Sequence, residues 1–204
     1  MSYRYYQMIR LFDIVFSGIG LIVLSPLFLI VYILIRIESK GGGFYSQERI
    51  GLNGKPFRLY KFRSMRQDAD KGSLITVGGH DPRITRMGYF VRKYKIDELP
   101  QLWNVFVGDM SLVGPRPEVE RYTKLYTPEQ QKVLSVRPGI TDWASIEYVD
   151  ENVILGRAED PDKAYIEHIM PDKIRYNMKW IDNQGVFEYF KIIFYTFFKI
   201  AKNS

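Results

Sequence analysis

The longest apolar stretch of the chain runs from residue 14 to residue 35 and reads IVFSGIGLIVLSPLFLIVYILI, with no charge in 22 positions. As one α-helix it would be about 33 Å long, enough to cross the apolar layer of a bilayer. A cleaved signal peptide fits poorly, because the stretch is too long and no small-residue cleavage site follows it. The pattern predicts a membrane helix.

A Ser-Pro pair interrupts this helix near its middle. Pro26 cannot donate a hydrogen bond to the carbonyl of Ile22, and its ring opens the helix there. The hydroxyl of Ser25 can satisfy that carbonyl instead, as a helix inside a membrane requires. Each half is then roughly 15 Å long, about half of the apolar thickness.

The charges beside the helix favour neither orientation. Arg4 and Arg10 precede it, and Arg36 and Lys40 follow it. Because basic residues prefer the cytoplasmic side, both ends are expected there, as in a helix that enters, breaks and returns. Kinked helices that span the bilayer are also common, so these residues alone leave re-entry and spanning open.

Short strands are expected after the glycines at 41–43. Residues 44–65, FYSQERIGLNGKPFRLYKFRSM, predict two strands joined at Asn53-Gly54, a pair typical of tight hairpin turns. Residues 66–82 are polar with several glycines, which predicts a loop.

Helical spacing of apolar positions resumes at 84–96. Another helix is expected to begin near Asp97, a favourable N-cap residue, with Pro100 in its first turn. TPEQ at 127–130 has the pattern of a capping box at a further helix start. Asp160-Pro161 repeats a start signal, before a helix that Pro171 is expected to interrupt.

The last twenty residues, GVFEYFKIIFYTFFKIAKNS, contain five phenylalanines and predict an amphipathic helix. Its more polar positions recur every three or four residues, at Glu188, Lys191, Tyr195, Lys199 and Lys202. The wide apolar face suits either the membrane interface or the protein core, and the pattern does not choose between them.

Composition narrows the chemistry. The chain has 204 residues, which suggests one domain, and 29 basic against 23 acidic residues, a net charge of +6 that suits nucleic acid, acidic lipid headgroups or phosphorylated metabolites. It has no cysteine, which excludes thiol catalysis and disulfides, and His80 and His168 are its only histidines, too few for a histidine-rich zinc site. Carboxylates, hydroxyls, Lys, Arg and a hard metal ion remain.

Two adjacent acids stand out in IDELPQLWNVFVGDMSLVGPRPE, residues 96–118. A carboxylate at a helix N-terminus is expected to stay ionised. That suits a nucleophile or a ligand for Mg²⁺, which proteins hold through one or two carboxylates together with substrate phosphates. The ordinary alternatives are a plain N-cap for Asp97 and a solvated acid for Glu98.

Basic residues near predicted turns and helix ends strengthen the functional interpretation. They are Lys61, Arg63, Arg92, Arg116 and Arg137. Arg116 and Arg137 adjoin prolines, and a rigidly held guanidinium binds phosphate through two parallel bonds. An acid pair, a metal and several arginines together suggest phosphoryl transfer, although single basic residues are usually solvated surface charge. No Walker A loop or dinucleotide fingerprint is present, so a P-loop ATPase is not expected.

Several motifs resemble those of the small monotopic phosphoglycosyl transferases, bacterial membrane sugar transferases that start the assembly of capsule, O-antigen, exopolysaccharide and glycoprotein glycans. They are RLFDIVFSGIGLIVLSPLFLI, YKFRSM, DPRITRMGYFVRKYKIDELPQLWNVFVGDMSLVGPRPE and VRPGIT. The resemblance covers nearly the whole chain, and its long central block is highly specific.

The resemblance implies a mechanism and a fold. Asp97 matches the family's nucleophile and Glu98 its partner, with Asp97 also a ligand of the Mg²⁺ cofactor. The reaction would move a phosphosugar from a UDP-sugar to undecaprenyl phosphate through a covalent aspartyl intermediate. The fold would be α+β and mostly helical, with a re-entrant helix at 1–40 broken at Ser25-Pro26. Residues 41–204 would form one catalytic unit with a small hairpin and amphipathic interfacial helices.

The resemblance also implies binding residues and partners. The residues expected to bind substrate are Lys61, Arg63, Arg92, Arg116, Glu118 and Arg137. The expected partners are a UDP-sugar, undecaprenyl phosphate and membrane lipid, not nucleic acid, with a homodimer left open. The expected location is the cytoplasmic face of the bacterial inner membrane.

The match weakens after VRPGIT. Many relatives continue with glycine, WAQ and an Asn-Gly pair, whereas this chain reads DWASIEYVDE at 142–151. The sugar therefore stays open among galactose, glucose, N-acetylgalactosamine and diacetamido sugars. Two other classes of protein also remain as alternatives, a non-catalytic membrane-surface scaffold and a membrane-attached metal-dependent phosphodiesterase.

Overall fold

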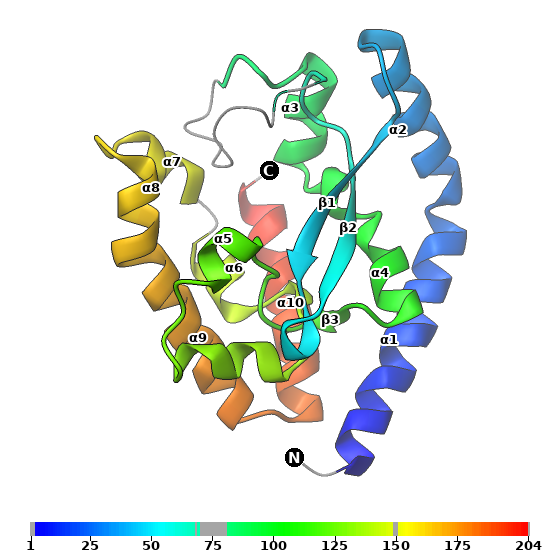
Figure 1. Ribbon diagram of the computed structural model, residues 1–204. Coiled ribbons are helices and arrows are strands. Elements are labelled where there is room, and N and C mark those ends of the chain that lie inside the picture. The colour runs from blue at the N-terminus through cyan, green and yellow to red at the C-terminus, as the bar shows by residue number, and fades with distance from the viewer. Residues whose placement is uncertain (1–2, 68, 70–80, 149–150, 204) are drawn as a thin grey trace.

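The computed structural model describes residues 3–67, 69, 81–148 and 151–203. Figure 1 shows a long broken helix along one side, a β-hairpin in the middle and shorter helices on the other side. The described chain is mostly helical with two small sheets, which agrees with the predicted α+β class.

The bounds of the elements are as follows. The helices are α1 (Tyr3–Val23), α2 (Ser25–Glu38), α3 (Arg86–Lys93), α4 (Gln101–Val107), α5 (Glu120–Thr123), α6 (Trp143–Glu147), α7 (Glu151–Gly156), α8 (Pro161–Ala164), α9 (Met170–Asp182) and α10 (Val186–Asn203). The strands are β1 (Phe44–Ile50), β2 (Pro56–Phe62), β3 (Ser111–Val113) and β4 (Gly139–Thr141). Short 3₁₀ turns cover Leu52–Gly54, Ile96–Glu98 and Gln130–Ser135, and a π-helical turn covers Tyr165–Ile169.

The N-terminal apolar stretch forms two helices. α1 ends at Val23 and α2 begins at Ser25, whose hydroxyl donates a 2.8 Å hydrogen bond to the Ile22 carbonyl. In Figure 1 the two helices form a bowed rod whose middle lies farthest to the right. Within the described residues, Tyr5–Val23 is the one helical segment whose length and composition would allow it to cross a membrane, and it is 11% buried.

The predicted hairpin is present. β1 and β2 pair antiparallel, from Phe44 opposite Phe62 to Ile50 opposite Pro56. Asn53 and Gly54 both have positive φ, 55° and 73°, which is the backbone conformation that makes this pair a hairpin signal. The polar stretch 66–82 lies mostly outside the described residues.

A second, parallel pairing was not predicted from the sequence. β3 and β4 pair through Ser111 with Gly139 and Val113 with Thr141. The two backbones then run so close that a Cβ on Gly139 would lie 2.0 Å from the nitrogen of Gly114. This contact places the GPRPE loop directly beside VRPGIT.

Two predictions about helices, one start and one interruption, need correction. Asp97 is not an N-cap: it lies inside the turn Ile96–Glu98, and α4 begins later, after Pro100. Pro171 does not interrupt its helix, because the preceding turn widens to a π-helical one and α9 continues through the proline.

Two other predicted starts are confirmed. Thr127 and Gln130 exchange the two hydrogen bonds of a capping box, at 2.9 and 3.3 Å, although the turn that follows is 3₁₀. The Asp160 side chain accepts from the Lys163 N–H at 3.0 Å at the start of α8.

The core connects the rod to the rest of the chain. Val31 and Ile35 of α2 pack against Phe62 of β2 and Val91 of α3. At the other side, Trp180 of α9 packs with residues of α10 and β3. These contacts hold the hairpin between the rod and the helices that follow.

α10 presents two apolar faces. Tyr189 and Ile192 are fully buried in the core, whereas Phe187, Phe194 and Phe197 are 81%, 68% and 70% exposed. The helix therefore covers the core, which was one of the two interpretations of its apolar face. A second apolar face of the same helix is exposed.

Candidate active site

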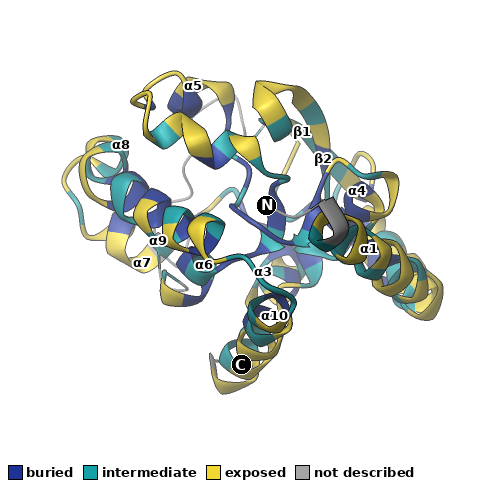
Figure 2. Ribbon diagram, turned by 90° about the horizontal axis from the view of Figure 1, so that it is seen from below, coloured by how far each residue is buried: buried dark blue, intermediate teal, exposed yellow. Residues whose placement is uncertain are grey.

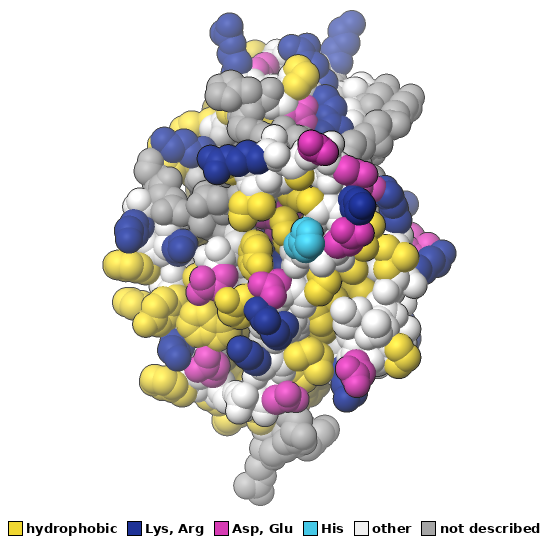
Figure 3. Space-filling model, turned by 90° about the vertical axis from the view of Figure 1, so that its left-hand side faces the viewer, with side chains coloured by type: hydrophobic (Ala, Val, Ile, Leu, Met, Phe, Trp, Pro, Cys, Tyr) yellow, Lys and Arg dark blue, Asp and Glu magenta, His cyan; other side chains and the backbone are white. Residues whose placement is uncertain are grey.

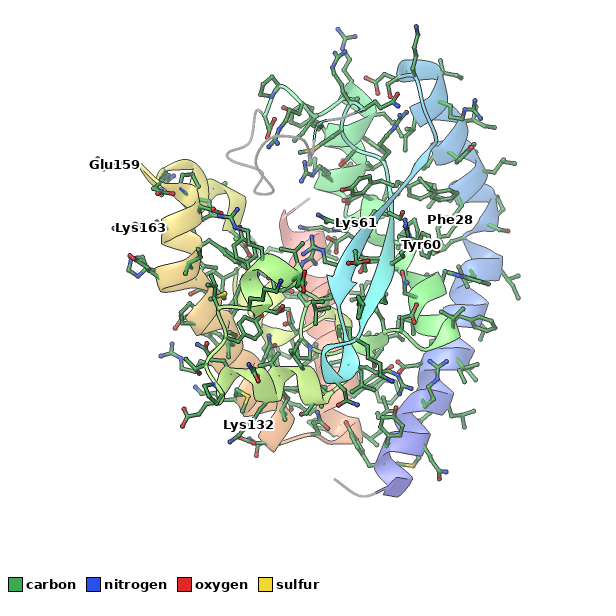
Figure 4. All side chains as sticks on the ribbon, viewed as in Figure 1. Phe28, Tyr60, Lys61, Lys132, Glu159 and Lys163 are labelled. Carbon is green, nitrogen blue, oxygen red and sulfur yellow. The ribbon has the colours of Figure 1, made fainter. Side chains whose placement is uncertain are left out.

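Two basic side chains converge on the second member of the acid pair. Lys61, near the end of β2 and labelled in Figure 4, places Nζ 3.2 Å from Oε1 of Glu98. Arg116, in the loop after β3, donates from Nη1 to Glu98 Oε2 at 3.2 Å and from Nη2 to Oε1. Segments far apart in the sequence thus meet at one carboxylate.

These cations determine the charge state of Glu98. Burial alone would raise the pKa of Glu98, but the positive charges of Arg116 and Lys61 outweigh burial and hold that pKa well below its usual range. The negative charge of Glu98 in turn raises the pKa of Arg116. Glu98 is therefore an ionised carboxylate fixed in a charge-assisted bidentate pair.

Asp97 has a different environment. It is only 7% exposed, and among the described residues no donor forms a hydrogen bond with its carboxylate. Burial raises the pKa of Asp97, and the negative charge of Glu98 raises it further, against the opposing charges of Lys61 and Arg92. The structural reason expected for an ionised Asp97, a position at a helix N-terminus, is therefore wrong, because Asp97 does not cap the helix.

The loop that carries Arg116 is fixed by its backbone. The carboxylate of Asp142 accepts from the Arg116 N–H at 3.3 Å and from the Ser145 N–H at 2.7 Å. Gly114 donates to the carbonyl of Thr141 at 3.0 Å. Asp142, which opens the segment where the chain departs from its resemblance, is thus a support for Arg116.

Glu118 anchors the other end of the same loop. Its carboxylate accepts from the hydroxyl of Tyr165 and lies 3.7 Å from Nη1 of Arg49. Arg49 also donates to the carbonyl of Pro117 at 3.2 Å. No local sequence pattern indicates Arg49 or Tyr165, because each reaches Glu118 from a distant element.

The remaining sequence-predicted residues lie elsewhere or at the margin. Arg63 donates to the carbonyls of Ser39 and Lys40 and so closes the end of α2. Arg137 donates from Nε to the carbonyl of Gly108 at 2.7 Å and does not contact Glu98. Arg92 lies near enough to Asp97 to lower its pKa. Their roles in substrate binding stay predictions.

The acid pair is the candidate magnesium site. The described residues contain no group of three or more His, Cys, Asp or Glu able to hold a metal. Mg²⁺ nevertheless binds through one or two carboxylates with substrate phosphates. Because both oxygens of Glu98 are already occupied, Asp97 is the side chain whose unengaged carboxylate fits such an ion.

Comparisons with known proteins identify the family that the chain resembles. A family model described as bacterial sugar transferase matches residues 4–203. The chain is 48% identical over 126 residues to a Bacillus subtilis protein described as a candidate undecaprenyl-phosphate N-acetylgalactosaminyl 1-phosphate transferase, covering 62% of the chain and 70% of that protein.

Longer relatives match over nearly the whole chain. It is 37% identical to the UDP-N-acetylgalactosamine-undecaprenyl-phosphate N-acetylgalactosaminephosphotransferase of Aeromonas hydrophila, over 90% of the chain and 41% of that protein. It is 36% identical to the UDP-glucose:undecaprenyl-phosphate glucose-1-phosphate transferase of Klebsiella pneumoniae, over 93% of the chain and 39% of that protein. The chain thus spans about two fifths of the length of these two relatives.

Proposed function

The chain belongs to the bacterial sugar transferase family, and from this premise we propose that it transfers a sugar 1-phosphate from a UDP-sugar to undecaprenyl phosphate. The products would be an undecaprenyl diphosphate sugar and UMP, and the reaction would open the assembly of a bacterial polysaccharide or other glycan. Relatives with this reaction in their names support the proposal.

One observation carries the proposal within the structure. An ionised, fixed glutamate lies beside a buried aspartate that has no hydrogen-bond donor among the described residues. Lys61 and Arg116 bring two positive charges to the same place. A negatively charged diphosphate is attracted to these cations, and the unengaged carboxylate of Asp97 is available to attack it.

In the first step, an oxygen of Asp97 attacks the phosphorus that carries the sugar. The bond from that phosphorus to the bridging oxygen breaks, and UMP leaves with the electron pair. Arg116 and Lys61 offset the charge that develops on the phosphate oxygens. Glu98 holds both cations in place, so it acts as the residue that organises them.

In the second step, an oxygen of the lipid phosphate attacks the same phosphorus and the bond to Asp97 breaks. This route lets a water-soluble nucleotide sugar and a membrane lipid use one site in turn. Mg²⁺, when bound at Asp97 with the substrate phosphates, would neutralise diphosphate charge and keep Asp97 ionised despite its raised pKa.

The surface of the protein supports a place at the membrane. The middle of the α1–α2 rod exposes apolar side chains, with Ile22 75% and Val23 68% exposed, and Trp103 on α4 is 49% exposed. The face shown in Figure 3, by contrast, mixes basic and acidic side chains, as a water-facing surface does. We propose that the rod is re-entrant and holds the catalytic unit on the cytoplasmic face of the inner membrane.

A lipid-free reaction tests the mechanism. Purified protein with Mg²⁺ and each of several UDP-sugars should release at most about one equivalent of UMP and gain the mass of a phosphosugar on Asp97. Asp97→Asn should abolish both signals, whereas Asp182→Asn, an exposed aspartate in α9, should behave like the unmodified protein.

The alternatives give different outcomes in the same assay. A scaffold would release no UMP from any nucleotide sugar, even with undecaprenyl phosphate present. A phosphodiesterase would release UMP continuously with water as acceptor and would leave free sugar phosphate. A single turnover without lipid, followed by many turnovers with it, is the pattern expected for the transferase.

A further inference from the structure

A cavity of about 100 Å³ lies at the N-terminal end of α1, away from the acid pair. We call it the foot cavity; its walls include Tyr5, Arg10, Leu52, Arg137, Trp180 and Gln184. Leu52 lies in the hairpin turn, whereas Lys61 lies near the other end of β2, roughly 17 Å along the strand. Figure 2 views the molecule from this end, with the start of α1 toward the reader.

Two residues of the walls each carry a buried polar atom that has no partner within the described part of the chain. The two atoms are the indole Nε1 of Trp180, a donor, and the amide Oε1 of Gln184, an acceptor. Trp180 as a whole is only 7% exposed. Buried polar groups are nearly always hydrogen-bonded, so this pair indicates a ligand that both accepts and donates, as a hydroxyl or hydroxylated ester does.

Two guanidinium groups add positive charge. Arg10 donates to the carbonyls of Val105 and Phe106 at 2.5 and 2.8 Å, and Arg137 donates to that of Gly108 and lies 5.0 Å from the centre of the Tyr6 ring. Each guanidinium has five N–H donors, and these bonds use only some of them.

Asp13 also lines the cavity, and one oxygen of its carboxylate is engaged by three hydrogen-bond donors. Its Oδ1 accepts from Ser111, the Leu112 N–H and Tyr189. No carboxylate pairs with Arg10 or Arg137 among the described ion pairs. The cavity therefore has a positive balance and donors to spare.

We propose that the foot cavity binds the headgroup of an anionic glycerophospholipid. The phosphate would meet Arg10 and Arg137, and a glycerol hydroxyl would join Trp180 Nε1 to Gln184 Oε1. The volume is too small for a nucleotide sugar, since pockets for ligands of that size run to roughly 300 Å³ or more. The place also fits, because basic and aromatic residues at the foot of a membrane helix bind anionic headgroups. This proposal rests on the membrane attachment proposed above and not on the transferase chemistry.

Indole NMR tests the site at the atom concerned. The chain has three tryptophans, so ¹⁵N-tryptophan labelling gives three indole N–H signals, which Trp→Phe variants assign. In maltoside micelles, short-chain phosphatidylglycerol should shift the Trp180 signal saturably. The signal of Trp103, exposed on α4, should not follow the same saturation curve.

Controls separate the sources of phosphate. Short-chain phosphatidylcholine, which lacks a free hydroxyl and net negative charge, should leave the Trp180 signal in place. Equal shifts with both lipids, no shift with phosphatidylglycerol, or equally tight binding of inorganic phosphate would each overturn the proposal.

Variants connect the signal to the named side chains. Gln184→Met should weaken phosphatidylglycerol binding roughly fivefold through one lost hydrogen bond, and Arg137→Gln at least about tenfold through a lost charge. Gln184→Met should leave UMP release unchanged, so loss of the lipid site and loss of the transferase reaction remain distinguishable. Unchanged lipid binding in both variants would contradict the site.

Discussion

At the scale of single residues, two neighbouring carboxylates have opposite environments. Glu98 is paired with Arg116 and Lys61, which lower its pKa, whereas Asp97 is buried beside that negative charge, and its pKa is raised. Adjacent positions in the sequence can therefore serve different purposes. One acid is paired with two cations, and the other has no hydrogen-bond donor among the described residues.

The first prediction uses these opposite shifts. Because the folded pKa of Glu98 lies below its ordinary value of 4.5, its ionised form stabilises the fold above that pH, and this stabilisation is lost as the pH falls. Glu98→Gln should thus lower the free energy of unfolding at pH 7 by on the order of 2–3 kcal/mol, since two cations lose their partner. The cost should shrink below pH 4.5, as measured by denaturant unfolding.

Asp97→Asn should have the opposite sign. The raised pKa of Asp97 means that its ionised form destabilises the fold, so removing the charge should raise the unfolding midpoint at neutral pH. The gain should vanish as the pH falls below its ordinary value of 3.8. A loss of stability at pH 7 in this variant would show that Asp97 is held by a favourable partner and would contradict the assignment.

The second prediction concerns the shape of one cation. Arg116→Lys keeps the charge but loses the bidentate pair with Glu98, so initial UMP release should fall about 100-fold. The matched control is Arg175→Lys in α9, where the exposed arginine pairs with Asp172 on the same helix. Near-normal UMP release by Arg116→Lys would remove this residue from the mechanism.

At the scale of elements, the parallel pair β3–β4 brings the two proline-containing motifs together. The loop after β3 carries Arg116, and its backbone bonds to the carbonyl of Thr141, at the end of β4, and to the side chain of Asp142, directly after it. The position of the Arg116 guanidinium therefore depends on a strand contact only three residues long on each side.

The third prediction follows from this contact. Gly139→Ala would place a Cβ 2.0 Å from the nitrogen and 2.5 Å from the oxygen of Gly114, atoms that cannot move without breaking the strand pair. The midpoint of thermal unfolding should fall markedly, by a cost of about 3 kcal/mol or more. Gly185→Ala, which would meet nothing within 4 Å, is the control and should unfold like the unmodified protein.

Secondary-structure elements were predicted from the sequence better than the contacts between them. The hairpin turn at Asn53-Gly54 and the capping box at 127–130 depend on neighbouring residues, so local patterns suffice. β3 and β4 are each three residues long and carry no periodicity that distinguishes them from loop. The N-cap prediction for Asp97 was wrong because Asp97 lies in a separate 3₁₀ turn that follows the left-handed Lys95, and α4 begins only after Pro100.

The candidate site shows the same limit. The sequence indicated Glu98 and Arg116, and the structure shows that they form an ion pair. Local sequence patterns did not indicate Arg49 or Tyr165, because their contacts with Glu118 arise from the tertiary fold. The contacts of Arg137 with the Gly108 carbonyl and with Tyr6 of α1 were likewise not predicted, since proximity to proline does not indicate where a side chain points.

At the scale of the whole molecule, the bowed rod decides how the protein meets a membrane. The fourth prediction is that both of its ends face the cytoplasm. The chain has no cysteine, so Gln7→Cys and Lys40→Cys variants, both at exposed positions, give clean single labels. Each should react with an impermeant maleimide added to inside-out vesicles and not to intact spheroplasts.

A spanning helix would give a different result. One of the two positions would then react only from the periplasmic side. Ile22→Cys, at the middle of the rod, should stay unreactive from both sides, because it lies within the apolar layer. Pro26→Leu returns an N–H donor to the Ile22 carbonyl and should shift labelling toward the spanning pattern.

The buried carboxylate of Asp13 also imposes an order of events during synthesis. It lies in the first helix, yet its three hydrogen bonds come from Ser111, Leu112 and Tyr189, the last of them 176 positions further along the chain. Until these segments have been synthesised, the carboxylate of Asp13 lacks its donors. The bond from Tyr189 can form only after synthesis has reached α10, so α1 cannot complete its packing before then.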